Sequence, residues 1–497
     1  MKLGQLEYKW IVGGVFVLGL FMELLDMTIV NVALPELARS LEVDPESAAT
    51  DIQWVVTGYL LSLAVFIPIS GWLGDRFGTK AIFMTALFVF TSASLASGLA
   101  WSLESLIAFR VLQGVGGGML TPVGTAMLFR AFPPHERAKA ASILMIPMVV
   151  GPASGPVLGG YLVEFHSWRW IFLINIPVGV LGLIFAGLFL KEERQDAPGR
   201  LDLPGLVLAG VGLAALLYAL AQAGQNGIGD SQVLAIGGAG LATLAIFTAV
   251  EYFGEEPMID VRLFANKLFS AANVVQLVGF AALMGGLFLL PLLLQAEMGL
   301  SPFESGLTTF PQAIGIVLMV QIGSRMYGRV GPRRMMMVGL AGITATTLAF
   351  LWVDLDTSQW TIRGIMFVRG CFFSFVIISL QTATFATISP QMMGRASAIA
   401  SAGRQVGASL GVALLATVLT SRLAAHDTAL GPAADTGAAL DAFHEAFLVA
   451  AALAAVGTIA ALLVSDKDAA VSMNLVEEPV GEPPDAEGAA TPVSAGR

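Results

Sequence analysis

Long apolar stretches recur along almost the whole chain and are separated by short polar segments. An apolar run of about 18 residues or more is long enough to cross a bilayer as a helix. Fourteen such runs are found, at residues 10–34, 53–72, 80–100, 104–130, 140–163, 169–190, 203–222, 232–253, 269–295, 304–327, 335–353, 361–388, 396–420 and 441–464. The pattern predicts an all-α polytopic membrane protein with 14 transmembrane helices.

The polar segments divide the chain into four predicted parts. A charged linker follows the sixth run, and two runs without charged residues in their cores follow that linker. We expect a six-helix bundle over 1–190, a linker with two extra transmembrane helices over 191–268, a second six-helix bundle over 269–464 and a disordered tail over 465–497.

Composition agrees with a membrane protein and removes several classes of function. Charged residues make up 12% of the 497 positions, against about 25% in typical soluble domains. The single cysteine, Cys371, excludes an intrachain disulfide and the usual thiolate metal clusters. Neither a Gly-Lys phosphate-binding motif nor a cluster of catalytic His, Cys or Ser is found within the runs. We therefore expect no enzyme, no cofactor and no metal, and an ion gradient rather than ATP as the energy source.

Lysine and arginine are distributed unequally between the two sides of the predicted bundle. Of the 26 basic residues, 19 fall on the side of the N-terminus, four on the other side and three within runs. Because basic loops stay in the cytoplasm, we expect a multi-pass protein of the plasma (inner) membrane with both termini cytoplasmic. The net charge of −10 comes largely from outer loops and the tail, so nucleic-acid binding has no support.

The first apolar run carries two acidic residues, Glu23 and Asp26. A carboxylate at mid-membrane is costly unless it is paired, protonated or hydrated, and it is a functional candidate by default. The two residues are three positions apart and share a helix face, and the same helix ends in Asn31 and Pro35, which give it one polar edge. We interpret Asp26 as a proton-binding switch; a structural ion pair is the alternative. Arg110, in the fourth run, is its natural partner, and Gln113 follows on the same face.

Two glycine-rich motifs distinguish the first half of the chain. The loop between the second and third runs contains Gly71, Asp75, Arg76, Gly78 and Lys80, whose charges can pair with helix ends at the cytoplasmic face; an ordinary basic loop is the alternative. The fifth run aligns three glycines on one face, with prolines beside two of them, and this pattern predicts a bent helix suited to rocking or to plain close packing. These residues are Gly151, Pro152, Gly155, Pro156 and Gly159.

The second half repeats these features weakly. Arg369 echoes Arg110, glycines at 403, 407 and 411 echo the fifth run, and residues 323–334 echo the first glycine loop without its acid. Polar residues of the runs are candidates to line a substrate cavity: Asn31, Gln113, Asn273, Gln276, Arg369 and Arg404. Glu23 and Asp26 favour cationic amphiphiles, whereas Arg369 and Arg404 would suit anionic or zwitterionic ones.

Together these motifs resemble the fourteen-span drug:proton antiporters of the major facilitator superfamily. The segments 25–35, 71–80 and 151–160 and the surroundings of Arg110 are similar to motifs of that superfamily, and the segments 168–177 and 404–407 to signatures of this branch. The resemblance implies two six-helix bundles with two inserted helices. It also implies that Asp26 is the coupling acid, that Arg110 is its proton-transfer partner and that residues 151–160 form a segment associated with exporters.

The function implied is proton-coupled antiport that exports lipophilic, cationic drugs or toxic amphiphiles by alternating access. Its partners would be a small lipophilic molecule, protons and the lipid bilayer, with a periplasmic adaptor and an outer-membrane channel if the host is Gram-negative. The alternatives are an exporter of a lipid, an antibiotic or another endogenous metabolite, and outside transport a membrane channel or a structural membrane protein.

Overall fold

The computed structural model describes residues 7–41, 52, 54–194, 202–254, 260–426, 428 and 436–473, and within these it contains helices and no strands. The α-helices are α1 (Tyr8–Ser40), α3 (Trp54–Phe77), α4 (Thr79–Gly98), α5 (Leu103–Ala131), α6 (Arg137–Phe165), α7 (Trp170–Leu173), α8 (Asn175–Phe189), α9 (Leu203–Asn226), α10 (Ser231–Phe253), α11 (Lys267–Leu292), α12 (Pro302–Thr309), α13 (Pro311–Val330), α14 (Pro332–Leu348), α15 (Gln359–Phe385), α16 (Met393–Ala425) and α17 (Thr436–Ala460). Short 3-10 or π turns are η2 (Pro134–Glu136), η3 (Val261–Ala265), η4 (Leu293–Glu297), η5 (Ala349–Trp352), η6 (Pro390–Met392), η7 (Ala461–Leu463) and η8 (Ala470–Met473).

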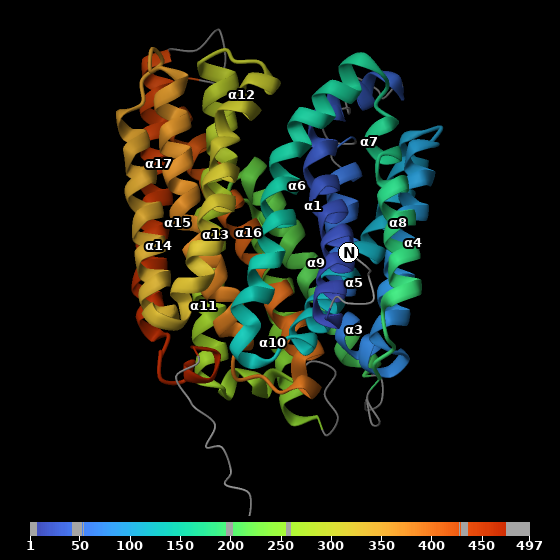
Figure 1. Cartoon of the computed structure of the whole chain (residues 1–497). Helices are drawn as coiled ribbons and strands as arrows, with labels where there is room; N and C mark the ends of the chain where they lie inside the picture. Colours follow the sequence, from blue (N-terminus) through green and yellow to red (C-terminus); the bar gives the residue numbers. More distant parts are fainter. Residues whose placement is uncertain are drawn as a thin grey trace, which may run out of the picture.

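The predicted all-α membrane architecture is confirmed. Within the described residues, 13 helices are long and apolar enough to cross a membrane. The 29-residue helix α6 lies along α1 and crosses the bundle as a further long helix (Figure 1). Since no backbone group can be left unpaired in lipid, a chain of this composition is restricted to such helices.

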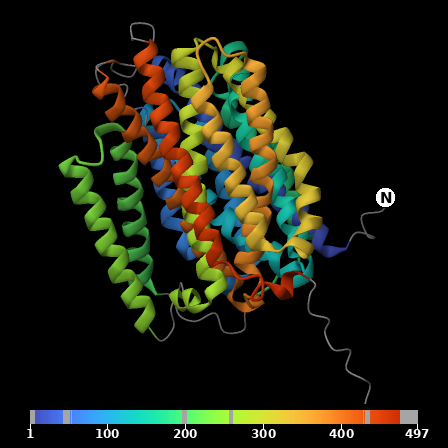
Figure 2. The same ribbon diagram turned by 90° about the vertical axis from the view of Figure 1, so that its left-hand side faces the viewer.

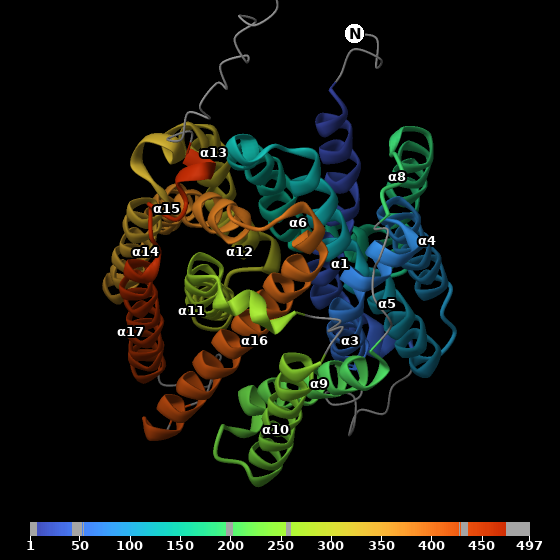
Figure 3. The ribbon, with the colours of Figure 1, turned by 90° about the horizontal axis from the view of Figure 1, so that it is seen from below.

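The helices form two halves with a hairpin beside them. Helices α1 to α8 make one half and α11 to α17 the other (Figure 1). The hairpin of α9 and α10 stands outside both, as the views from the side and from below show (Figures 2 and 3), and α9 packs against α3 of one half and α16 of the other. We call the end of the bundle that holds Tyr8, η2 and η8 the lower end, as in Figure 1.

Corresponding turns at the lower end have the same design in both halves. Gly78 between α3 and α4 has φ 100°, and Gly331 between α13 and α14 has φ 87°; both values favour glycine. The Glu192 carboxylate accepts two backbone N–H groups at the start of α4, at 3.1 and 3.2 Å. Asp466 accepts one at the start of α14, at 2.9 Å. An acid from a distant segment thus caps each helix, where the helix dipole favours negative charge.

The ordered chain extends beyond the predicted boundary at residue 465. Asp466 caps α14, the Ser472 and Tyr327 hydroxyl groups are 2.9 Å apart, and Met473 is buried. The prediction of a disordered tail is therefore wrong for Ser465 to Met473, because these side chains find polar and apolar partners in the second half. The remainder of the predicted tail, 474–497, lies outside the described residues.

An ion-pair cluster at Glu136 fixes the start of α1 to the turn before α6. The Lys139 ammonium lies 2.8 Å from one carboxylate oxygen of Glu136, and the Lys9 ammonium lies 2.5 Å from the other. These hydrogen bonds, that of Lys139 foremost, lower the pKa of Glu136 from 4.5 to about 2. The carboxylate is therefore ionised throughout the physiological range.

We expect Glu136→Gln to lower the melting temperature by about 1–2 °C at neutral pH, because the pairs are partly exposed. Since the folded pKa is depressed, the stabilisation is present above pH 4.5 and is lost as the pH falls towards 2. The difference in melting temperature between wild type and variant, followed by scanning fluorimetry, should stay constant from neutral pH down to about pH 5 and shrink below it. A difference that changes between neutral pH and pH 5 would contradict this account.

Candidate functional site

A buried carboxylate, Asp26, lies at the centre of a polar cluster within the first half. Its Oδ2 atom accepts a hydrogen bond from Arg110 Nη1 at 2.5 Å. Its Oδ1 atom accepts bonds from Gln113 Nε2 at 2.9 Å and Asn175 Nδ2 at 3.3 Å. Asp26 has no exposed surface and Arg110 is 1% exposed. The pair is sealed from solvent in this conformation, and three helices, α1, α5 and α8, supply its members.

Arg110 is held on every side by other groups of the first half. Its Nε atom donates to the Val55 carbonyl at 3.1 Å, and Nη1 also donates to Gln113 Oε1 at 2.9 Å. The guanidinium lies over the Tyr59 ring, 4.2 Å from its centroid. A buried cation needs such compensation for its lost hydration. Arg110 can therefore remain buried even when the charge of Asp26 changes.

Glu23, one helical turn from Asp26, has a different environment. It is 5% exposed and accepts a hydrogen bond from the Thr121 hydroxyl at 2.6 Å. It also interacts electrostatically with Arg404 on α16, in the other half. The two acids predicted to share a face do so, but they have separate partners: Asp26 is paired within the first half, and Glu23 also experiences a charge of the second half.

Three members of this cluster were absent from the sequence-based candidates: Tyr59, Thr121 and Asn175. Asn175 had a signal, since it lies inside the segment 168–177 that resembles a branch signature. Tyr59 and Thr121 had none, because uncharged residues inside an apolar run are common in packed helices.

The glycines of α6 lie against the helix that carries the two acids. A Cβ atom at Gly151 would be 3.0 Å from Leu24 Cβ, and one at Gly159 would be 3.0 Å from Ile29. At Gly155 it would overlap the Thr28 hydroxyl, whereas Gly160 has open space beside it. The stripe therefore allows α6 and α1 to approach closely next to Asp26.

Two predicted residues of these helices are only partly described. Asn31 in α1 and Pro156 in α6 belong to ordered helices, but their side chains lie outside the described part of the structure. Pro152 is half-buried on α6. None of the three contributes a described contact to the Asp26 cluster.

The loop motif of residues 71–80 lies at the lower end and contacts the second half. Asp75 pairs with Arg130 Nη2 at 2.7 Å, and Arg130 Nε donates to the Pro390 carbonyl at 2.9 Å. A Cβ atom at Gly71 would be 2.8 Å from the Gly394 carbonyl oxygen at the start of α16, so only glycine fits this approach. Within the same motif Arg76 is exposed, and the Lys80 ammonium donates to a carbonyl at the end of α8 at 2.8 Å.

Further bonds between the halves lie beside this motif. Arg137 on α6 donates to the carbonyl groups of Phe385, Ala386 and Ile388, where α15 ends. The Ser397 hydroxyl donates to the Pro122 carbonyl at 2.7 Å. A cation at a helix C-terminus is favourable because the last carbonyls carry partial negative charge. We call these contacts, with those of Arg130 and Gly71, the lower-end junction.

The candidates of the second half make no described hydrogen bond to the Asp26 cluster, although Arg404 interacts electrostatically with Glu23. Gln276 donates to the Ala400 carbonyl at 2.5 Å and Asn273 to the Phe269 carbonyl at 2.8 Å, so both side chains bond to nearby helix backbone. Arg404 is half-buried. Arg369 is 1% exposed and lies against α11 at Gly286. The polar residues predicted to line one cavity therefore occupy several separate positions in this conformation.

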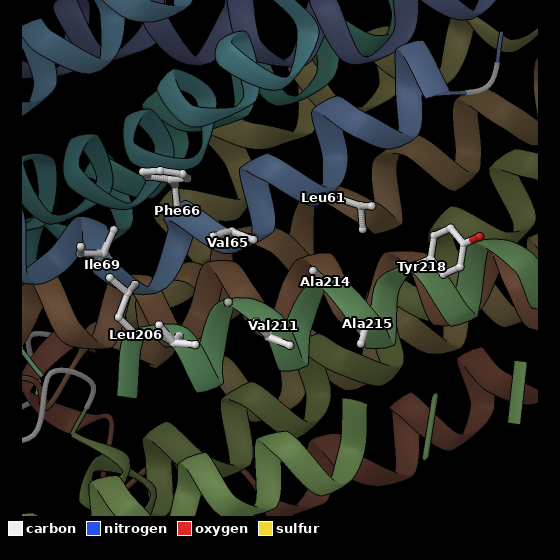
Figure 4. Close-up of a pocket in the computed structure, with 11 residues that line it drawn as sticks. Leu61, Val65, Phe66, Ile69, Leu206, Val211, Ala214, Ala215 and Tyr218 are labelled. Atoms are coloured by element: carbon white, nitrogen blue, oxygen red, sulfur yellow. The ribbon is translucent and has the colours of Figure 1, made fainter. Parts of the chain in front are cut away.

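A pocket of about 550 Å³ lies between α3 and α9, away from these residues. Apolar side chains of both helices face each other across it (Figure 4), namely Leu61, Val65, Phe66 and Ile69 of α3 and Leu206, Val211, Ala214, Ala215 and Tyr218 of α9. No acidic or basic residue lines it. It offers nothing that would recognise a charged substrate, and the Asp26 cluster remains the candidate site.

Comparisons with known proteins agree on one family. The sequence pattern of the Major Facilitator Superfamily matches residues 16–412. The chain is 37% identical over 411 residues to the multidrug resistance protein B homolog of Mycobacterium tuberculosis, covering 82% of this chain and 75% of that protein. It is 37% identical over 415 residues to the putative multidrug resistance protein MdtD of Escherichia coli O1:K1 / APEC, covering 82% and 85%. The fold is similar to that of the proton:xylose symporter XylE, with a TM-score of 0.65, 14% identity and coverage of 94% and 98%.

Proposed function

This chain belongs to the major facilitator superfamily of membrane transporters, and on that premise we propose that it is a proton-coupled antiporter that exports lipophilic cations by alternating access. It is a multi-pass membrane protein of the multidrug resistance type. The proposal goes beyond this class in three respects: the coupling ion, the direction of transport and the charge of the substrate.

The Asp26–Arg110 pair is the observation that supports proton coupling. An ionisable residue buried within a membrane span marks a proton or ion pathway by default. Asp26 accepts hydrogen bonds from three side chains, those of Arg110, Gln113 and Asn175. Protonation would remove the attraction to Arg110 while Val55, Gln113 and Tyr59 continue to hold the guanidinium. Asp26 can thus become neutral while the buried Arg110 guanidinium keeps other partners.

We propose that this charge change alters the balance between two arrangements of the halves. Asp26 lies on α1, against which the α6 glycines pack, and α6 also contributes Arg137 to the lower-end junction. Movement of α1 is therefore transmitted to the contacts that join the halves. The energy available from the membrane potential is about 2.3 kcal/mol per charge per 100 mV.

The orientation and the substrate belong to the same proposal. The excess of Lys and Arg supports a location in the inner membrane with the lower end and both termini on the cytoplasmic side. Glu23 and Asp26 support cationic amphiphiles, since an ionised carboxylate in a low-dielectric site attracts a cation strongly. A periplasmic adaptor and an outer-membrane channel belong to this proposal only if the host is Gram-negative.

Proton release on substrate binding tests the proposal directly. Purified protein in detergent, in a weakly buffered solution near neutral pH, should release protons when ethidium is added, because the cation replaces the proton at the carboxylates. A pH-sensitive dye measures the release, and fluorescence of ethidium measures its binding. Ethidium binding without proton release would argue against antiport, and a channel or structural protein would show neither response.

A further inference from the structure

A second fully buried arginine, Arg369 on α15, has no hydrogen-bond partner among the described residues. Its side chain is 1% exposed. Its three nitrogens, Nε, Nη1 and Nη2, have no acceptor among the residues that the structure describes. A guanidinium carries five N–H donors and remains charged at any physiological pH. A buried cation without a counter-charge destabilises a fold, so packing alone does not account for this residue.

Arg110 provides the comparison within the same molecule. Both arginines lie on corresponding helices of the two halves, α5 and α15. Arg110 has a carboxylate, an amide oxygen, a backbone carbonyl and an aromatic ring around it. Arg369 has none of these partners within the described residues. Among the described residues, the first half therefore provides a carboxylate for its buried arginine, and the second half provides none.

The Arg369 guanidinium packs directly against a glycine of α11. Gly286 on α11 faces the guanidinium, and a Cβ atom there would be 2.6 Å from Nη2 and 3.4 Å from Nη1. On the next residue, Gly370, a Cβ atom would overlap the Gln312 carbonyl of α13. The side-chain oxygen of Gln312 is itself buried without a donor. Helices α11, α13 and α15 thus meet around polar groups that have no hydrogen-bond partner in the described part of the structure.

We propose that Arg369 binds the carboxylate of an anionic or zwitterionic amphiphilic substrate. The planar guanidinium matches a carboxylate in two parallel hydrogen bonds, which gives both affinity and orientation. Gly286 has no side chain to cover Nη1 and Nη2. Separation of α11 from α15 during transport would therefore expose these two atoms to a substrate. This inference rests on the proposed transport function and extends its substrates: the first half attracts positive charge at Glu23 and Asp26, and the second half receives negative charge at Arg369.

Three probes with the same aromatic skeleton test the charge preference: 2-naphthoate, 2-naphthylmethylammonium and neutral 2-naphthylmethanol. Binding to the full chain in detergent is measured by calorimetry and by the shift in melting temperature, without any gradient. We expect wild type to bind naphthoate and Arg369→Gln to bind it about tenfold or more weakly, since charged hydrogen bonds are lost. Binding of the ammonium probe should be unchanged.

Arg363→Gln is the matched control on the same helix. Arg363 already bonds to Gln359 at 3.1 Å and lies 4.7 Å from the Trp360 ring centroid, so its loss should leave naphthoate binding unaltered. Gly286→Asp is a second, independent variant. Its Cβ atom would lie 2.6 Å from Arg369 Nη2, so the guanidinium must shift. The added carboxylate should then pair with Arg369 and weaken naphthoate binding about tenfold or more.

Two outcomes would overturn the assignment to Arg369. One is the absence of naphthoate binding to wild type; the other is equal naphthoate affinity in wild type, Arg369→Gln and Gly286→Asp. Either result, obtained while ethidium still releases protons, would leave the proposed antiport standing. Loss of ethidium-coupled proton release with naphthoate binding intact would instead count against antiport alone.

Discussion

Asp26→Asn should reduce proton-driven export of ethidium to background while the protein still folds. Asparagine keeps the size of the side chain and an acceptor for Gln113, but it cannot take up a proton. Removing one member of a buried ion pair can cost about 3–5 kcal/mol when the other is left stranded. Arg110 keeps Val55, Gln113 and Tyr59 in the variant, so we expect a smaller loss of about 1–3 kcal/mol.

The measurement is ethidium efflux in proteoliposomes with and without an imposed proton gradient. The variant should retain exchange of labelled for unlabelled ethidium at equilibrium and lose uphill transport. Glu36→Gln is the matched control, since Glu36 is a partly exposed carboxylate on the same helix, paired with Arg39 at 3.6 Å. Uphill pumping by Asp26→Asn at the wild-type rate would remove Asp26 from the coupling mechanism.

Gly155→Ala should have the second large effect, on stability and transport together. The added methyl group would overlap the Thr28 hydroxyl and lie 2.8 Å from Thr28 Cβ and 3.1 Å from the Ile29 backbone nitrogen. Overpacking of this kind costs about 1–3 kcal/mol. Helix α1 must move away from α6, and Asp26 lies only two residues from Thr28. We expect a lower melting temperature and ethidium efflux reduced about tenfold or more.

Gly160→Ala is the matched control for this variant. Gly160 lies on the same helix but has no atom within 4 Å of the added Cβ position. Its replacement should leave both the melting temperature and the efflux rate at wild-type values. If the two alanine variants behave alike, the effect would come from helix propensity rather than from the α1–α6 contact.

The buried charges made the main features of this molecule predictable from the sequence. Charged residues are so costly inside apolar runs that Arg110 implied an acidic partner, and Asp26 was the natural candidate. The contact is present at 2.5 Å. The roles of these residues in proton coupling remain predictions.

Other features depend on how the helices are rotated against one another, which an apolar pattern does not specify. Thr121 meets Glu23 because both face the α1–α5 contact, whereas Thr28 of α1 donates to the Leu24 and Leu25 carbonyl groups of its own helix. Arg369 was recognisable as a buried charge, but the absence of a partner for it among the described residues follows from three helices packing together. The tail boundary was misplaced because Ser472 and Met473 are ordered by Tyr327 and its surroundings, about 145 positions earlier in the chain.

The lower-end junction has a consequence for how this protein can vary. Most side-chain donors of the junction, Arg130 and Arg137, belong to the first half. Most acceptors are main-chain carbonyl groups of the second half, between Phe385 and Pro390. Every amino acid carries the same carbonyl, so substitutions along that stretch can accumulate without breaking closure, provided that α15 still ends there. Adaptation to new compounds can therefore proceed in the second half while the closing contacts stay intact.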